Sequence, residues 1–179
     1  MPRHPALVEQ IISREQIADR VAVLGAEISE AYAGRTLAMT CVLKGGFVFL
    51  ADLVRAITVP CSIDFMVISS YASGTQTSGI VRILKDLDEP IEGLDVLVVE
   101  DIVDSGLTLS YLLRNLETRR PLSLEVCTLL AKPARLENEV RCRYVGFEIP
   151  NSFVVGYGLD AGQRFRELPD IWAVDEGKL

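Results

Sequence analysis

The most informative stretch of this sequence is Val98-Val99-Glu100-Asp101-Ile102-Val103-Asp104-Ser105-Gly106-Leu107-Thr108. It begins inside an apolar run, Asp95 to Val99, that is typical of a strand at the centre of a parallel sheet. Helical periodicity follows over Leu109 to Leu116. The stretch therefore predicts a strand, an acidic turn and a helix. In an open parallel sheet, ligands bind beyond the carboxyl ends of the strands, so we expect this turn to face a pocket.

Similar patterns elsewhere predict the other elements. Thr36 to Leu43 is apolar enough for a buried strand, and Phe47 to Ala56 has a helical pattern. A long helix is expected over about Arg14 to Ala33, because Ser13 to Gln16 has the form of a capping box and Gly34 is a natural stop. Further strands are expected at Cys61 to Tyr71, Ser123 to Ala131, Tyr144 to Phe147, Phe153 to Gly158 and Ile171 to Val174.

This alternation of strands and helices predicts an α/β fold. We expect a Rossmann-like, mainly parallel central sheet flanked by helices, in a single domain over residues 1–179. The polar segment from Ala72 to Gly79 has no hydrophobic anchor and is expected to be a mobile loop.

Composition limits the classes of function. The net charge is -7 with one histidine, so the chain offers no general field for nucleic acid, and we expect no nucleic-acid partner. No apolar run approaches the roughly 18 residues that cross a bilayer, and the start lacks a signal-peptide core, so we expect no membrane association and a cytoplasmic location. The four cysteines lack metal-binding spacing and are expected to be reduced and buried.

The acidic turn has the chemistry to hold a phosphorylated sugar. The segment Asp104, Ser105, Gly106, Leu107 and Thr108 can place backbone N–H groups and hydroxyls at a helix start, where the dipole favours an anion such as a phosphate. Glu100 and Asp101 suit sugar hydroxyls or a hydrated magnesium ion. The alternative is that Asp104 or Ser105 only caps a helix and that the two acids form a solvated turn.

The full pattern resembles the phosphoribosyl-pyrophosphate motif of the type I phosphoribosyltransferases. More of the chain is similar, in order, to the hypoxanthine-guanine branch of that family. The matching segments are Leu43-Lys44-Gly45-Gly46, Ser70-Tyr71, Lys132, Val145-Gly146-Phe147-Glu148-Ile149-Pro150, Phe153-Val154-Val155-Gly156-Tyr157, Leu159-Asp160 and Phe165-Arg166. Taken singly, Phe153 could be core, Lys132 a surface residue and Arg166 half of an exposed ion pair.

The resemblance implies a role for each segment. Ser70 and Tyr71 would open a lid over about residues 70–80, and a small hood from the N- and C-terminal segments would cover the base. A cis peptide between Leu43 and Lys44 is implied as well. The implied ligand sets are pyrophosphate at Lys44, Gly45 and Arg166, ribose at Glu100 and Asp101, the base at Lys132, Phe153, Val154 and Asp160, and magnesium at Glu100, Asp101 and Asp160.

The implied activity is magnesium-dependent transfer of the 5-phosphoribosyl group from phosphoribosyl pyrophosphate to N9 of hypoxanthine or guanine, by a homodimer or homotetramer. Asp104 would be the general base at N7 of the purine. Lys132 would donate to the 6-oxo group, and it has nothing to accept the amino hydrogens of adenine. Xanthine-guanine preference and a non-catalytic regulator of the same fold are the alternatives.

Two features depart from some relatives. Leu107 stands where those relatives carry lysine, so a side-chain contact from this position to the phosphate is not expected. The loop from Ala72 to Gly79 lacks acidic residues that some relatives carry.

Overall fold

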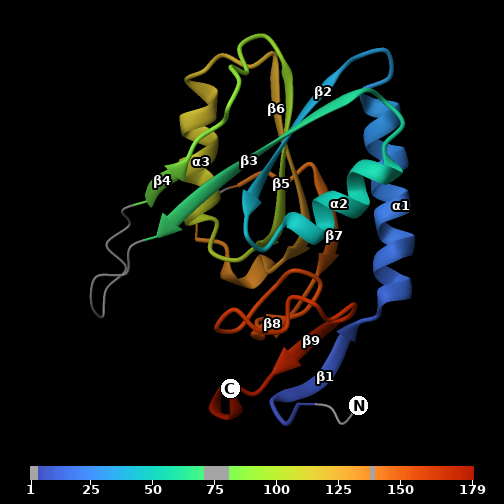
Figure 1. The fold of residues 1–179 in the computed structure, drawn as a ribbon, viewed down its shortest axis with the longest axis vertical. Coiled ribbons are helices and arrows are strands. Elements are labelled where there is room, and N and C mark those ends of the chain that lie inside the picture. The colour runs from blue at the N-terminus through green and yellow to red at the C-terminus, as the bar shows by residue number, and fades with distance from the viewer. Residues whose placement is uncertain (1–3, 71–80, 138–139) are drawn as a thin grey trace.

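The computed structural model describes residues 4–70, 81–137 and 140–179, which form two sheets (Figure 1). The larger sheet has the strand order β4-β3-β2-β5-β6-β7, and within it only the β3–β4 pair is antiparallel. The predicted mainly parallel sheet is therefore confirmed. Its strands are β2 (Leu37–Leu43), β3 (Cys61–Ser70), β4 (Val81–Lys85), β5 (Asp95–Val103), β6 (Ser123–Ala131) and β7 (Tyr144–Glu148).

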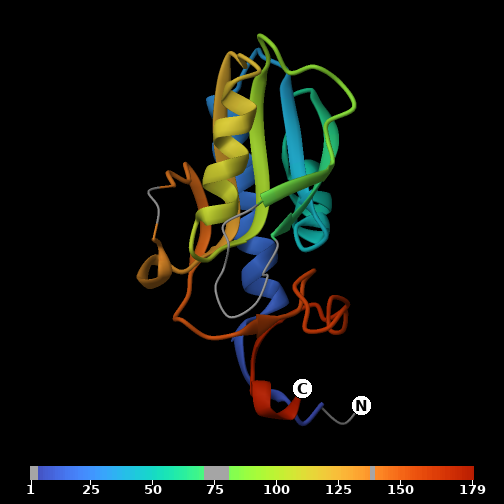
Figure 2. The ribbon, with the colours of Figure 1, turned by 90° about the vertical axis from the view of Figure 1, so that its left-hand side faces the viewer.

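Helices cover both faces of this sheet. Helices α1 (Arg14–Ala31) and α2 (Phe47–Ala56) lie on one face, and α3 (Leu107–Glu117) lies on the other (Figure 2). Because side chains alternate along a strand, Leu97 and Val99 pack with α1 and α2, whereas Val96 and Val98 pack with α3. Strand β5 is thus buried on both faces, as its continuous apolar run predicts.

Local signals set the ends of α1. The Ser13 hydroxyl accepts a hydrogen bond from the Gln16 N–H at 3.3 Å, and the Gln16 side chain accepts one from the Ser13 N–H at 2.9 Å. This is the predicted capping box. Gly34 then adopts a φ of +75°, a conformation that glycine reaches without a steric penalty.

The acidic turn differs from its prediction. Strand β5 continues to Val103, because β6 is long enough to pair with it as far as Val103 and Ala131. Glu100 and Asp101 therefore belong to the end of the strand rather than to a turn. Helix α3 begins at Leu107, two residues before the predicted start, directly after Gly106 at a φ of +78°.

The smaller, antiparallel sheet has the order β1-β9-β8 and joins segments from both ends of the chain. It lies beyond the carboxyl ends of the parallel strands (Figure 1). Its strands are β1 (Leu7–Ile12), β8 (Val154–Val155) and β9 (Ile171–Val174), and two short 3-10 turns, η1 (Pro133–Arg135) and η2 (Glu176–Lys178), complete the elements described.

The sequence did not predict β1, and it predicted β8 too long. Three consecutive residues in β1, from Val8 to Gln10, are exposed, so the strand lacks the alternation that signals one buried face. The predicted strand from Phe153 to Gly158 is cut to two residues, because Gly156, Tyr157 and Gly158 all have positive φ. Within the described residues, no helix is both long and apolar enough to cross a membrane.

Candidate functional site

A cavity of about 320 Å³ opens at the carboxyl ends of the parallel strands, beneath the segments that follow β8. A second cavity of about 190 Å³ adjoins it, and Ile102 and Asp104 line both. The first cavity is lined by Lys44, Gly45, Asp101, Ile102, Asp104, Lys132, Phe153, Val154, Leu159, Asp160 and Arg166. The second is lined by Val42, Glu100, Ile102, Val103, Asp104, Ser105, Gly106, Thr108 and Leu109.

The structure thus gathers residues that were predicted from segments far apart in the chain. Two of the predicted parts of the site are not among the described residues that line either cavity. Leu107 starts α3 with an exposed side chain and lines neither cavity. Ser70 is the last residue of β3, and Tyr71 and the loop from Ala72 to Gly79 lie outside the described residues.

The smaller cavity has features that suit an anion. Gly106, in the left-handed conformation, turns the chain so that α3 starts at the cavity wall. The first N–H groups of a helix have no partner within the helix, and its dipole favours negative charge there. The Ser105 hydroxyl accepts from the Leu107 N–H at 3.4 Å, which leaves other backbone donors of this turn for a ligand.

Two adjacent acids lie where β5 ends. Glu100 is only 8% exposed, and its burial, together with the neighbouring Asp101 charge, raises its pKa well above the usual range. Burial also raises the pKa of Asp101 to about 6, against the opposing effect of hydrogen bonds that include one from the Ile102 N–H. Asp101 itself is only partly buried and lines the larger cavity. Two adjacent carboxylates repel each other, and a bound cation would relieve that repulsion.

These two acids suit a magnesium ion that is shared with substrate and water, rather than a metal whose ligands all come from the protein. Within the described residues, no group of three or more histidine, cysteine, aspartate or glutamate side chains is arranged to hold a metal. Magnesium is commonly bound through one or two carboxylates, with water and substrate phosphates as its other ligands. Glu100 and Asp101 supply hard oxygen donors of this kind.

The turn from Lys44 to Gly46 packs directly on Asp101. The peptide between Leu43 and Lys44 is cis, as the family resemblance implied. A methyl group on Gly45 would collide with the Asp101 carboxylate. Any side chain at position 45 would therefore force the Asp101 carboxylate to move from this corner.

Two cations from distant segments meet across the same cavity. The Lys44 ammonium donates to the Gln163 side-chain oxygen at 3.1 Å, and the Arg166 guanidinium approaches that oxygen at 3.4 Å. Arg166 also pairs with Asp160 at 2.7 Å and donates to the Gly158 carbonyl at 2.7 Å. The sequence did not predict Gln163, since a neutral amide within a turn carries no signal of its own.

Asp104 is held between two cations. The Lys132 ammonium, in a residue that is 6% exposed, lies 3.2 Å from Asp104 Oδ2, and the Arg135 Nε lies 2.9 Å from Oδ1. Although partial burial acts in the opposite direction, hydrogen bonds from Arg135 and Lys132 hold the pKa of Asp104 below its ordinary value. The sequence analysis did not predict a role for Arg135. The signal that could have found it is its position, three residues after the predicted base-binding residue Lys132.

An aromatic side chain lines the same cavity as this pair. Phe153 is 40% exposed although large and apolar, and Val154 beside it is buried in β8. An exposed aromatic side chain in a polar cavity can stack on a flat ring. A planar ligand with polar edges would contact Phe153 through its face and Lys132 and Asp104 through its rim.

Comparison with known proteins agrees with this geometry. A family model of the phosphoribosyl transferase domain matches residues 8–161. The chain belongs to this phosphoribosyl transferase family. The motif resemblance found in the sequence is thereby confirmed.

Relatives of known structure or curated name match most of this phosphoribosyl transferase chain. The hypoxanthine-guanine phosphoribosyltransferase of Mycobacterium avium is 55% identical over 171 residues, which are 92% of this chain and 84% of the relative. The hypoxanthine phosphoribosyltransferase of Escherichia coli is 50% identical over 169 residues, which are 93% of this chain and 95% of the relative. A crystal structure of a Staphylococcus aureus hypoxanthine phosphoribosyltransferase is 42% identical and has a TM-score of 0.92. The match covers 96% of this chain and 94% of the Staphylococcus aureus chain.

The packing of Gly45 on Asp101 generates a prediction. Gly45→Ala should displace the Asp101 carboxylate, because the added methyl group has no free space. Overpacking typically costs about 1–3 kcal/mol, so the free energy of unfolding in urea should fall by about that amount. Phosphoribosyl transfer should fall about tenfold or more in kcat/KM.

Gly177→Ala is the matched control. Gly177 lies in η2, and its added methyl group would also face an aspartate oxygen, that of Asp175 just before η2, but at 3.3 Å and away from both cavities. We expect both quantities to be near those of the unaltered protein. Equal effects of the two substitutions would contradict a specific requirement for glycine at position 45.

Proposed function

We propose that this protein transfers the 5-phosphoribosyl group from phosphoribosyl pyrophosphate to N9 of hypoxanthine or guanine and releases pyrophosphate, as a step of purine salvage. The observation that carries the proposal is the Lys132–Asp104 pair, 3.2 Å apart, in a cavity also lined by the exposed Phe153. On a 6-oxopurine, the O6 acceptor and N7 are neighbours on one edge. A donor next to a carboxylate complements that edge.

Each part of the sugar phosphate has a place in the two cavities. The turn from Asp104 to Thr108 holds the 5-phosphate at the start of α3, and Glu100 with Asp101 binds the ribose hydroxyls. Lys44, Gly45 and Arg166 hold the pyrophosphate. Glu100 and Asp101 would also hold magnesium, which when bound supplies positive charge to the departing pyrophosphate. The Asp160 carboxylate, which the family resemblance implied as a third ligand, instead pairs with Arg166, and the described residues hold no group of three such side chains arranged around a metal.

Placement of charge accounts for most of the chemistry. The Lys44 ammonium and the Arg166 guanidinium stabilise the pyrophosphate as its bond to C1′ of the ribose breaks, and the sugar acquires oxocarbenium character. N9 of the purine then forms the new bond to C1′. The Asp104 carboxylate accepts the proton at N7, so positive charge does not accumulate on the ring.

The base is read by three features of the cavity. Phe153 stacks on the purine face, Val154 offers backbone groups to its edge, and Lys132 donates to O6. The Asp160 side chain already pairs with Arg166 at 2.7 Å and accepts from the Gln163 N–H at 2.8 Å. Asp160 therefore contributes to the base site indirectly, because it holds Arg166 and the turn from Asp160 to Gln163 in place. We place the enzyme in the cytosol as a homodimer or homotetramer.

Lys132 provides the test of base recognition. Lys132→Ala removes the donor to O6 and leaves Arg135 on Asp104. A hydrogen bond from a charged donor is worth about 1.5–3 kcal/mol, so kcat/KM for hypoxanthine and guanine should fall about 10- to 100-fold. Use of adenine should fall much less, and KM for phosphoribosyl pyrophosphate should change little.

Lys178→Ala is the matched control for this test. Lys178 also pairs with an aspartate, Asp175 at 3.1 Å, but near the C-terminus and away from both cavities. Steady-state kinetics with each base should show no change for this variant. Equal losses on all bases in Lys132→Ala would contradict the assignment of Lys132 to the 6-oxo group.

Metal removal tests the role of the two adjacent acids. With excess chelator, nucleotide formation should fall to background and return when magnesium is added beyond the chelator. Phosphoribosyl pyrophosphate is highly charged, and two uncompensated carboxylates beside it would repel it. Undiminished turnover in a metal-free assay would contradict the role given to Glu100 and Asp101.

A further inference from the structure

Arg135 lies close to the site but outside its walls. It ends the short turn η1, which begins with Pro133 directly after Lys132, and it lines neither cavity. Two backbone hydrogen bonds fasten the segment around η1 to the strand end that bears Asp104. These run from the Lys132 N–H to the Val103 carbonyl at 3.0 Å and from the Glu137 N–H to the Ser105 carbonyl at 3.1 Å.

The two cations on Asp104 use different oxygens of its carboxylate. Arg135 Nε contacts Oδ1 at 2.9 Å, whereas Lys132 Nζ contacts Oδ2 at 3.2 Å. Lys132 lines the cavity together with Asp104, whereas Arg135 lines neither cavity. Each oxygen of the Asp104 carboxylate is thus held by a different cation, and only one of the two cations lines the cavity.

We infer that Arg135 is a positioning residue, which holds the Asp104 carboxylate ionised and correctly oriented when Lys132 turns to the purine. The inference rests on the proposed function, because that function assigns Lys132 to O6 and Asp104 to N7. Once Lys132 bonds to O6, its support of Asp104 weakens. Arg135 then remains as the cation that keeps the carboxylate in its charged, proton-accepting form.

Charged groups of both signs surround Asp104, and the acidic ones oppose its ionisation. Carboxylates that line the same two cavities disfavour another negative charge, and incoming phosphates do the same. An Arg135 guanidinium cannot lose its proton at working pH, so its support is constant. The charged groups that line the two cavities with Asp104, or that act on Arg135, are Lys44, Glu100, Asp101, Lys132, Glu137, Asp160 and Arg166.

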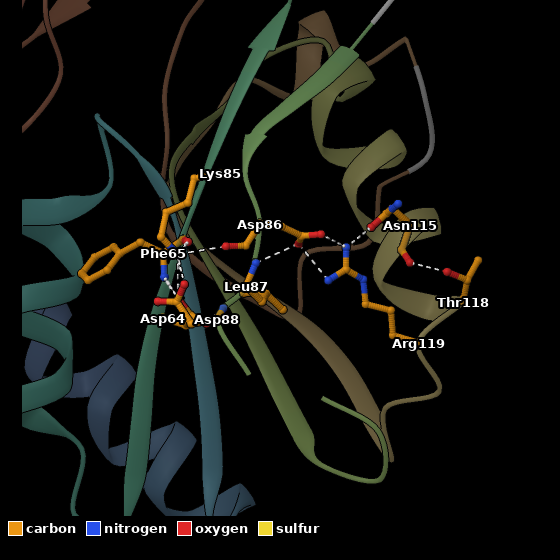
Figure 3. A network of polar contacts seen from close by, with 9 residues as sticks. All are labelled: Asp64, Phe65, Lys85, Asp86, Leu87, Asp88, Asn115, Thr118 and Arg119. Atoms are coloured by element: carbon orange, nitrogen blue, oxygen red, sulfur yellow. Dashed lines mark hydrogen bonds and ion pairs between the residues drawn. The ribbon is translucent and has the colours of Figure 1, made fainter. Parts of the chain in front are cut away.

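The test compares Arg135→Gln with a matched ion pair elsewhere. Arg119, beyond the end of α3, pairs with Asp86 at 2.8 Å and donates to Asn115 at 2.7 Å, in a network that ties α3 to the segment after β4 (Figure 3). Asp104 precedes the opposite end of α3, a helix of 11 residues and so about 16 Å long. Arg119→Gln therefore removes an arginine–aspartate pair without touching the site.

The pH dependence of kcat/KM for hypoxanthine is the main measurement. Ionised Asp104 is the active form, and it is lost as pH falls through its pKa, so removing Arg135 should move that loss to higher pH. An adjacent opposite charge shifts a carboxyl pKa by about 1–3 units, and less when solvated, so the acid-side midpoint should rise by about 0.5–1 unit in Arg135→Gln. Arg119→Gln should leave the midpoint unchanged, and Arg135→Lys, which keeps a positive charge, should give a smaller shift than Arg135→Gln.

Two further measurements separate positioning from other roles. In an Asp104→Asn background, adding Arg135→Gln should change kcat/KM by no more than about twofold, since the group through which Arg135 acts is gone. The carboxyl carbon-13 resonance of Asp104, assigned from its absence in Asp104→Asn, should titrate at higher pH in Arg135→Gln than in Arg119→Gln. Thermal melts of all variants report any loss of folding.

Three outcomes would overturn the inference. They are an unmoved acid-side midpoint in Arg135→Gln, an equal loss in the Asp104→Asn background, or an effect confined to KM for phosphoribosyl pyrophosphate, which would mean that Arg135 binds the phosphate itself. A native enzyme that makes no nucleotide from hypoxanthine would overturn the proposed function instead. The carbon-13 titration would then still decide whether Arg135 controls Asp104.

Discussion

The pairing of β5 with β6 is the constraint on which the site depends. The two strands run in parallel as far as Val103 and Ala131, and the Lys132 N–H then donates to the Val103 carbonyl at 3.0 Å. This register brings Asp104 and Lys132 together although they are 28 positions apart. A slip of one residue would turn every side chain at the end of β5 to the opposite face, so the site depends on this register.

An acidic chain can build an anion site because its cations are placed locally. The net charge of -7 gives no general attraction for a phosphorylated substrate. Lys44, Arg166 and Lys132 instead converge on one cavity, and each already has an acceptor, namely Gln163, Asp160 and Asp104 in turn. Such pairing orients the cations before a ligand arrives, which reduces the entropy lost on binding.

Much of the fold followed from local pattern, and the exceptions have physical causes. Helix α2 has the predicted bounds, Phe47 to Ala56, because an apolar periodic run follows a glycine break. Strand β1 was missed because its pairing with β9 is decided by tertiary structure, while three consecutive side chains, from Val8 to Gln10, stay exposed. The prediction for the β8 segment failed because non-glycine Tyr157 adopts a positive φ between two glycines, which no propensity indicates.

The candidate site was predictable where its residues lie in contiguous motifs. The stretch from Glu100 to Thr108 carries both the acids and the anion cradle, so its chemistry could be inferred from order alone. Gln163 and Arg135 act through residues from other segments, and their contacts exist only once β5, β6 and the turn after β8 have been assembled. Residues such as these, which act by holding other side chains, belong to no contiguous motif and are therefore hard to predict from sequence.

The most direct measurement of the central claim is a product assay that contains phosphoribosyl pyrophosphate, magnesium and one free base at a time. Hypoxanthine, guanine, xanthine, adenine and uracil should be compared at equal concentration, with the nucleotides separated and quantified. The account predicts rapid formation of the nucleotides of hypoxanthine and guanine and far slower use of adenine and uracil, because the cavity offers a cationic donor to a 6-oxo group. Preferred use of adenine or uracil, or no nucleotide from any base, would contradict it.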